Sequence, residues 1–95
     1  MAYRVELTSR AHRELAALPR DAQERIDARI LLLAEEHRPP GSKKLEGEEG
    51  LYRIRVGDYR VVYRIDDKVL VVLVVRIGRR GEVYRKRRRG KNRRG

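Results

Sequence analysis

The period of the hydrophobic residues changes twice along this chain. Tyr3, Val5 and Leu7 alternate with polar residues, which predicts a first strand with one buried face. Between residues 8 and 38 the apolar residues recur every three or four positions, as they do on one side of a helix. From residue 51 onward the two-residue period of a strand returns. The order β-α-α-β-β-β predicts an α+β domain in which a two-helix hairpin packs on a small, mainly antiparallel twisted sheet.

The helical region divides at Pro19. Thr8 or Ser9 can cap a first helix, whose apolar stripe is Ala11, Leu15 and Leu18. Asp21 begins the sequence DAQE, which resembles a capping box, and we expect its carboxylate to accept hydrogen bonds from the first free amides of a second helix. The apolar stripe of that helix is Ala22, Ile26, Ile30 and Leu33. We expect the helix to continue to about residue 38, where the sequence PPG stops it.

Three further strands are expected after a polar loop at residues 41–50. Gly57 fits the first central position of a type II′ turn, which fixes the register of the first two strands. The residues placed directly opposite one another are Val56 and Tyr59, Arg55 and Arg60, Ile54 and Val61, Arg53 and Val62, and Leu51 and Arg64. Tyr59 and Tyr63 fall on the other face of their strand from the arginines and are expected in the core. The last strand, residues 69–77, is apolar on both faces, so we expect it at the centre of the sheet and covered on both sides.

The two hairpin strands place arginine after arginine on one face. Arg55 faces Arg60, and Arg53 and Arg64 lie on the same surface with no acid between them. Like charges directly opposite one another destabilise a sheet, so an anion bound across the face would explain the pattern. Guanidinium pairs with phosphate through two hydrogen bonds, which favours a phosphate site. The alternative is an ordinary solvent-facing surface on which the arginine stems cover apolar area.

Composition adds a second basic feature. The 95-residue chain has a formal net charge of +11, and its last eleven residues contribute eight of these charges and no acid, which leaves +3 on residues 1–84. We expect residues 1–85 to form the folded domain and residues 86–95 to be a disordered basic tail. Such a tail suits a polyanionic partner such as nucleic acid. A solvated tail that serves only solubility fits the tail equally well.

Several classes of function are disfavoured by what the sequence lacks. It has no cysteine, no apolar N-terminal region typical of a signal peptide and no apolar run long enough to span a bilayer. We therefore expect a soluble cytoplasmic protein with no membrane partner. His12 and His37 fall on the two expected helices, at the surface, and have no neighbours at the spacing of metal ligands. We therefore expect no metal and no small-molecule cofactor.

Four segments carry a resemblance to a known family. They are YRVELTSRAHRELAALP from residue 3, KKLEG from residue 43, LYRIRVGDYRVVYRI from residue 51 and VVRIGRRGEVYR from residue 74. In this order and spacing they resemble the RelE/ParE superfamily of bacterial and archaeal toxins, in particular the RelE-like mRNA endonucleases. The resemblance implies a compact toxin that enters the ribosomal A site and cleaves the bound mRNA without a metal. In that reaction the 2′-OH of the RNA attacks the adjacent phosphate.

The resemblance also implies roles for individual residues. Carried over position by position, it gives a catalytic set of Arg53, Arg55, Arg60, Arg80 and Tyr84. The arginines would stabilise the charge of the phosphorane, and the tyrosine would stack on a base or orient the scissile step. We add as expected contacts to RNA phosphates the basic residues Lys43, Lys44, Arg64, Arg79 and Arg85.

This chain departs from the family at the general base. Family members often have lysine at the positions of Arg53 and Arg55, and an arginine, with a pKa above about 12, is a poor base. Either electrostatic stabilisation dominates, or another group such as Tyr84, Glu46 or Glu48 takes the proton. The partners implied are a cognate antitoxin that covers the arginine face, the 70S ribosome and mRNA. Two alternatives stay open: a ParE-like inhibitor of DNA gyrase without catalysis, and a non-catalytic RNA- or ribosome-binding module.

Overall fold

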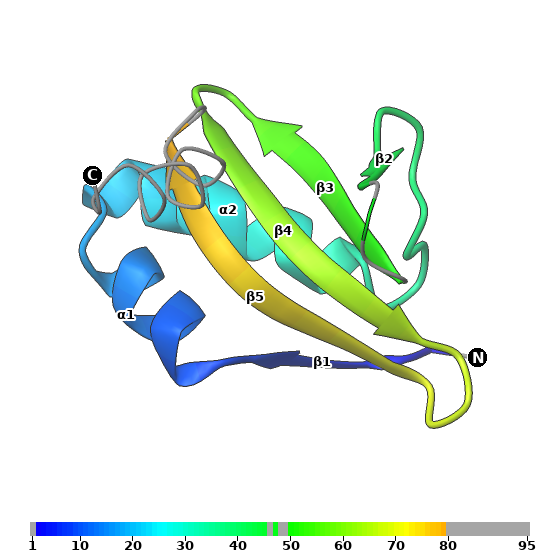
Figure 1. Ribbon diagram of the computed structural model, residues 1–95. Coiled ribbons are helices and arrows are strands. Elements are labelled where there is room, and N and C mark those ends of the chain that lie inside the picture. The colour runs from blue at the N-terminus through cyan, green and yellow to red at the C-terminus, as the bar shows by residue number, and fades with distance from the viewer. Residues whose placement is uncertain (1, 46, 48–49, 80–95) are drawn as a thin grey trace, which may run out of the picture.

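The computed structural model describes residues 2–45, 47 and 50–79 of the chain. Its elements, in chain order, are β1 (Arg4–Leu7), α1 (Ser9–Ala16), α2 (Arg20–Leu32), β2 (Lys43–Lys44), β3 (Leu51–Val56), β4 (Tyr59–Asp66) and β5 (Val71–Arg79). Figure 1 shows the strands as a twisted sheet with α2 behind it. No helix among these residues is long and apolar enough to cross a membrane.

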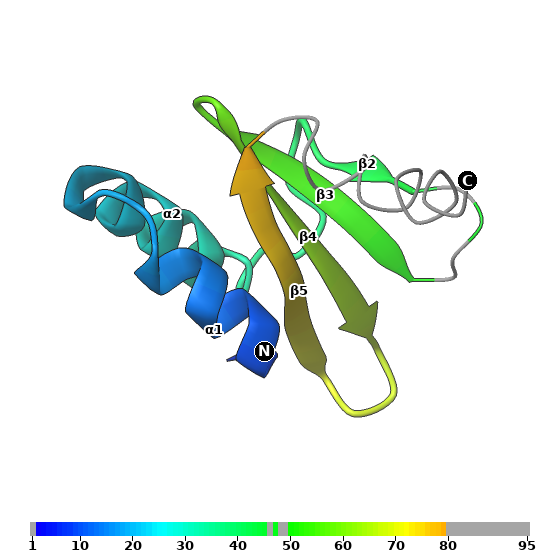
Figure 2. The same ribbon diagram turned by 60° about the vertical axis from the view of Figure 1, so that its left-hand side comes forward.

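The five strands form one sheet in the order β1-β5-β4-β3-β2. Only the pairing of β1 with β5 is parallel among the described strands, and the other three pairings are antiparallel. Both helices lie on the same face of the sheet, which Figure 2 shows most clearly. The predicted α+β class, with two helices on a mainly antiparallel sheet, is confirmed.

Strand β2 is absent from the predicted order. Lys43 pairs with Arg53 and Lys44 with Tyr52, at the edge of the sheet beyond β3. Sequence reasoning placed both lysines in a loop because two adjacent lysines carry no hydrophobic period. Residues 2–45, 47 and 50–79 therefore form five strands where four were predicted.

The hairpin of β3 and β4 has the predicted register in every pair. Gly57 has a φ of 62°, the positive value that the tight turn requires, and Arg55 lies directly opposite Arg60. The last strand begins at Val71 and not at residue 69, because the preceding turn extends through Leu70, which has a φ of 56°. Its central place between β1 and β4 is confirmed.

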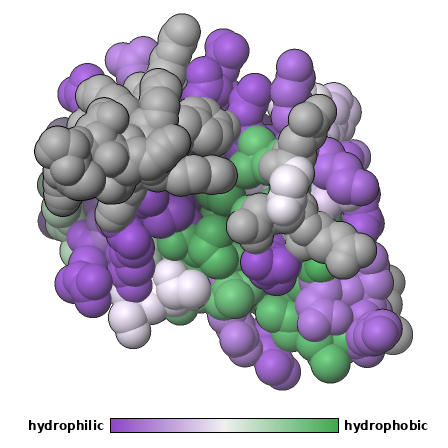
Figure 3. All heavy atoms as spheres, in the orientation of Figure 1, coloured by the Kyte–Doolittle hydropathy of each residue, from purple (hydrophilic) through white to green (hydrophobic). Residues whose placement is uncertain are grey.

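Among the described residues, no helix covers the second face of β5, which the sequence predicted to be covered. The described helices both lie on one side, and Val71, Leu73 and Val75 are half-buried on a strand whose alternate residues are fully buried. In Figure 3, which views the face away from the helices, a hydrophobic band runs between the polar side chains. An apolar strand can therefore be central without having helices on both faces.

The predicted start of α1 agrees with the structure, whereas the predicted cap of α2 does not. Thr8 is the N-cap of α1, and its hydroxyl oxygen accepts from the amide of Ala11 at 3.1 Å, as predicted. The predicted capping box of α2 is wrong, because the helix begins at Arg20 with Pro19 as its N-cap and no side-chain cap. Asp21 lies within the first turn instead, where a carboxylate still favours the helix dipole.

Helix α2 also ends earlier than predicted. It stops at Leu32, so His37 and Arg38 lie beyond it and not on its last turn. The backbone carbonyls after the end of α2 accept hydrogen bonds from other parts of the chain. The amide of Tyr3 donates to the carbonyl of Ala34 at 2.8 Å, and the Tyr63 hydroxyl donates to the carbonyl of His37 at 2.9 Å.

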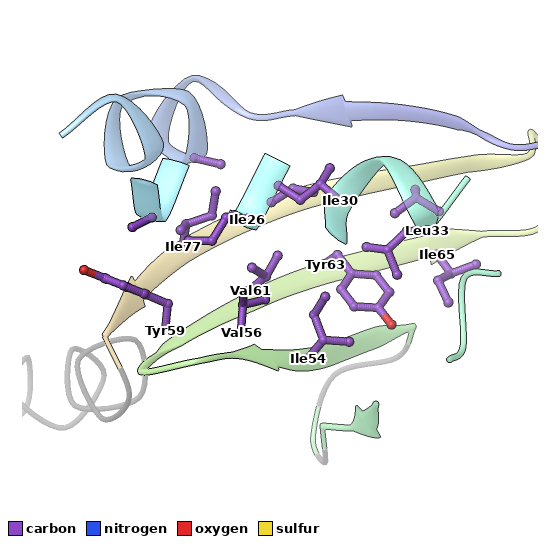
Figure 4. Close-up of a cluster of buried hydrophobic side chains, with 14 residues drawn as sticks. Ile26, Ile30, Leu33, Ile54, Val56, Tyr59, Val61, Tyr63, Ile65 and Ile77 are labelled. Carbon is purple, nitrogen blue, oxygen red and sulfur yellow. The ribbon is translucent and has the colours of Figure 1, made fainter. Parts of the chain in front are cut away.

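The core lies between α2 and the sheet. Ile26 and Ile30 of α2 are at most 1% exposed and face Val61 of β4, as Figure 4 shows. The predicted core positions Tyr59 and Tyr63 are buried in the same cluster. Burial raises the pKa of the Tyr63 hydroxyl to about 12. The uncharged phenol therefore holds the segment after α2 against the sheet.

Candidate functional site

The predicted arginine face exists on the side of the sheet away from the helices. Because directly opposed residues point to the same side, the observed pairings place one set of basic side chains on it: Lys43, Arg53, Arg55, Arg60 and Arg64. Within β2, β3 and β4 the one acid on this face is Asp66, at the far end of β4. We call these five residues the basic face.

Arg55 and Arg60 form a directly opposed like-charged pair of the basic face. They lie next to the Gly57 turn. Arg60 is only 8% exposed, whereas Arg55 is exposed. A buried guanidinium beside a second one produces a concentrated positive potential, which phosphate can neutralise through charge-assisted hydrogen bonds.

Strand β5 places a glycine next to this pair. Gly78 is the residue of β5 that lies opposite Arg60, so no side chain stands beside Arg60 at that register position. On the other side of the pair, Lys43 lies opposite Arg53, so β2 extends the basic face by one strand. The sequence could not place Lys43 there, because the pairing of β2 depends on the path of the chain after α2.

Arg79 does not join the basic face. It pairs with Tyr59, whose side chain points to the helices, and its guanidinium carbon lies 5.7 Å from the centre of the Tyr59 ring. The other residues predicted near it, Arg80, Tyr84 and Arg85, lie outside the described residues. The same holds for Glu46 and Glu48, the carboxylates considered as bases.

Lys44 and Arg64 lie at the opposite end of the sheet from the turn. They line one pocket of about 400 Å³ together with Arg38, Tyr52 and Asp67. Asp67 accepts from the Tyr3 hydroxyl at 2.7 Å and from Arg38 at 3.0 Å. These two hydrogen bonds, that of Tyr3 first, hold the pKa of Asp67 below its usual value. This end of the sheet is held together by its own hydrogen bonds.

The histidines do not form a site. His12 is exposed on α1, and the ring of His37 is stacked on Tyr3 with 3.9 Å between centroids. The sequence predicted that His37 lies at the surface of a helix. In the structure it is half-buried and lies beyond the end of α2. No group of three His, Cys, Asp or Glu residues that could hold a metal ion occurs within residues 2–45, 47 and 50–79.

The arrangement is suited to binding a polyanion by electrostatics. Four guanidiniums and one ammonium lie on the adjacent strands β2, β3 and β4, which are paired in one sheet. A sheet holds such groups at fixed spacing, with a rise of about 3.3 Å per residue. A single-stranded nucleic acid presents the matching series of phosphates.

Comparison with known proteins agrees with this architecture. The family model described as the ParE toxin of type II toxin–antitoxin systems, parDE, matches residues 5–84. The toxin RelE of Mycobacterium tuberculosis is 41% identical over 90 residues, which cover 87% of each chain. The mRNA interferase toxin RelE of Escherichia coli is 32% identical over 88 residues, covering 88% of this chain and 92% of the relative.

Solved structures of RelE toxins have the same fold as this chain. The archaeal RelE–RelB complex from Pyrococcus horikoshii contains a chain that superposes with a TM-score of 0.76 at 34% identity, over 85% of this chain and 98% of that one. Fold, length and sequence thus agree over nearly the whole domain. The chain therefore belongs to the RelE/ParE superfamily of type II toxins.

Proposed function

We propose that this toxin is a ribosome-dependent endonuclease that cleaves mRNA in the A site. The observation that carries the proposal is the directly opposed pair Arg55 and Arg60, one of them buried, on a face with Arg53 and Lys43. Two directly opposed cations repel each other, and an anion bound across the face would offset that repulsion. The relative from Escherichia coli is named an mRNA interferase, which supports RNA as that anion.

The proposed reaction is transfer of the phosphoryl group to the neighbouring 2′-OH. The 2′-oxygen forms a bond to phosphorus and loses its proton, the bond from phosphorus to the 5′-oxygen breaks, and that oxygen gains a proton. Negative charge accumulates on the phosphorane, where Arg53, Arg55 and Arg60 would stabilise it. Arg80 would add a fourth guanidinium and Tyr84 would stack on a base. Arginine holds its proton too firmly to act as the base, so electrostatic stabilisation is the main contribution.

We further propose a cognate antitoxin as the protein partner. The relative from Pyrococcus horikoshii was solved as a RelE–RelB complex, which supports a partner of the same kind here. An acidic segment would complement the basic face. Lys44, Arg64 and Arg85 would contact RNA phosphates around the A site. Arg79 would do so from the end of β5 beside the Gly57 turn. The reaction would take place in the cytoplasm.

Primer extension on a translated mRNA tests this function. Reactions contain the purified protein with and without 70S ribosomes, and the variants are Arg55→Ala and Arg80→Ala. Arg20→Ala, which removes an exposed arginine at the start of α2, on the helix side of the sheet, is the matched control. We expect cuts within A-site codons that require ribosomes, persist in the control and disappear in the other two variants. An uncut message with wild-type protein and ribosomes would refute the proposal.

Inhibition of DNA gyrase is the second candidate, because the matching family model is that of the ParE toxin. A non-catalytic inhibitor would bind gyrase through protein contacts and would not need the opposed arginines. A supercoiling assay with gyrase separates the two functions. Inhibition that is unaffected by Arg55→Ala would favour this candidate over the endonuclease.

A further inference from the structure

A cleft of about 360 Å³ opens at the edge of β3, next to the basic face. Residues from α2, the following loop, β2 and β3 line it: Arg29, Pro40, Gly41, Lys43, Arg53, Ile54 and Arg55. Four of these seven residues are cations and none is an acid. A cleft with this lining is complementary to an anion.

Arg29 is the member of the cleft that comes from a different layer of the fold. It precedes the buried Ile30 on α2 and is itself half-buried, so its stem lies close to the sheet edge. Among the described residues, no carboxylate lies within ion-pair distance of Arg29, Arg53 or Arg55. The cations of the cleft are therefore available to a ligand that brings its own negative charge.

An apolar groove of about 300 Å³ continues from the cleft along the end of α2. The two hollows share Arg29, Pro40 and Ile54, and the groove adds Leu32, Leu33, Glu35, Glu36 and Pro39. Leu32 is 61% exposed although it is a large hydrophobic residue. The continuous surface thus has a cationic end and an apolar end, as a nucleotide has a phosphate and a base.

We propose that this cleft is an RNA subsite in which Arg29 binds the phosphate of a nucleotide adjacent to the cleavage position, with its base in the apolar groove. The inference rests on the proposed function, because Arg53 and Arg55 belong both to the cleft and to the basic face. The same strand of RNA would therefore pass from the basic face over the edge of β3. Arg29 would position the strand and take no part in the chemistry.

An acidic protein segment fits this surface less well than RNA does. Glu35 and Glu36 line the apolar end, and they would repel carboxylates of an acidic helix lying along the groove. A nucleotide avoids this repulsion because its charge is confined to the phosphate and its base is neutral. The distribution of charge over the two hollows thus favours the nucleotide.

Binding of a non-cleavable RNA tests the inference without depending on cleavage. The probe is a fluorescent single-stranded 2′-O-methyl oligoribonucleotide, and its anisotropy is measured with wild-type protein, Arg29→Ala and Arg55→Ala at several salt concentrations. Arg20→Ala is again the matched control from α2. We expect Arg29→Ala to weaken binding about tenfold and to reduce the salt slope by about 1, as for the loss of one phosphate contact. Thermal unfolding followed by circular dichroism checks that each variant is folded.

A second set of probes locates the phosphate. Each probe carries one uncharged methylphosphonate linkage at a different position. At one position the neutral linkage should weaken wild-type binding but should not weaken binding by Arg29→Ala any further. Additive losses at every position would overturn the inference.

The outcomes distinguish this inference from the proposed function. If Arg29→Ala binds RNA as the wild type does while Arg55→Ala binds weakly, the subsite is wrong and the basic face stands. If both variants bind as the wild type does, both proposals fail. If Arg29→Ala keeps its RNA affinity but loses affinity for an acidic amphipathic peptide, the cleft is a protein-binding surface and the inference is overturned.

Discussion

Replacing Arg55 by glutamine should stabilise the isolated protein while weakening its binding to RNA. Arg55 lies directly opposite Arg60, and the substitution removes the charge while keeping most of the length of the side chain. Most substitutions destabilise a protein, so a gain in stability would be diagnostic of repulsion between these residues. The same change should impair binding, because it removes one of the two cations that the proposed function places against the RNA phosphate.

The size of the effect follows from the pairing and the burial. Like charges directly opposed on a sheet cost roughly 0.2 to 1 kcal/mol. Arg60 is 8% exposed, so solvent screens the pair poorly from that side, and we expect about 0.5 to 1 kcal/mol. For a domain of this size, that gain corresponds to a rise of about 2–8 °C in melting temperature.

Urea unfolding at low and high salt measures this gain. The difference between Arg55→Gln and wild type should be largest near about 20 mM salt and should nearly vanish near about 0.5 M, where the screening length is short. Arg4→Gln is the control, since Arg4 is also on a strand but lies opposite Val71 and pairs with Glu6 at 2.8 Å. That control should be neutral or slightly less stable than wild type.

Added RNA should reverse the order of stability. A non-cleavable RNA at about 100 times its dissociation constant stabilises the wild type by about 2.7 kcal/mol. A variant that binds about tenfold more weakly gains only about 1.4 kcal/mol under the same conditions. The wild type would then be the more stable protein. A variant that is less stable at low salt without RNA, or whose gain is the same at both salt concentrations, would refute the reasoning.

Two further predictions concern the anchoring of the segment after α2. Tyr63→Phe should cost about 1 to 2 kcal/mol in urea unfolding, because it leaves the carbonyl of His37 without its 2.9 Å hydrogen bond, and an unchanged midpoint would show that water replaces the hydroxyl. Asp67→Asn should remove a pH-dependent part of the stability. The pKa of Asp67 is lower in the folded state than in the unfolded chain, so the wild type should exceed the variant in stability above about pH 4 and lose this advantage as the pH falls below it. Unfolding midpoints that fall in parallel for both proteins between about pH 5 and 2 would contradict this assignment.

Local sequence determined the part of the fold that carries the basic face. The turn at Gly57 sets the register of β3 and β4, so the opposition of Arg55 and Arg60 could be predicted from a few adjacent residues. The N-cap of α1 at Thr8 is equally local. Features that depend on a single short stretch of chain are the ones that periodicity and turn chemistry can identify.

The missed features depend on segments far apart in sequence. Lys43 joins the basic face only because the chain returns to the edge of β3 after α2, and Arg29 reaches the cleft only through the packing of that helix. The alternation of β5 is also interrupted, since its register against β4 shifts between Val62 and Tyr63. A strand that is apolar at nearly every position gives no sign of such a bulge, so the side on which Arg79 emerges could not be predicted.

The position of β5 determines when the protein can fold. It lies between β1 and β4, so both halves of the sheet join through it, yet it comes after all the other described strands in the chain. During synthesis the β3–β4 hairpin can form early, whereas β1 must wait for a partner more than sixty residues away. A nascent chain that ends before Val71 cannot close its sheet. The ribosome must therefore complete nearly the whole domain before the toxin can acquire its native structure.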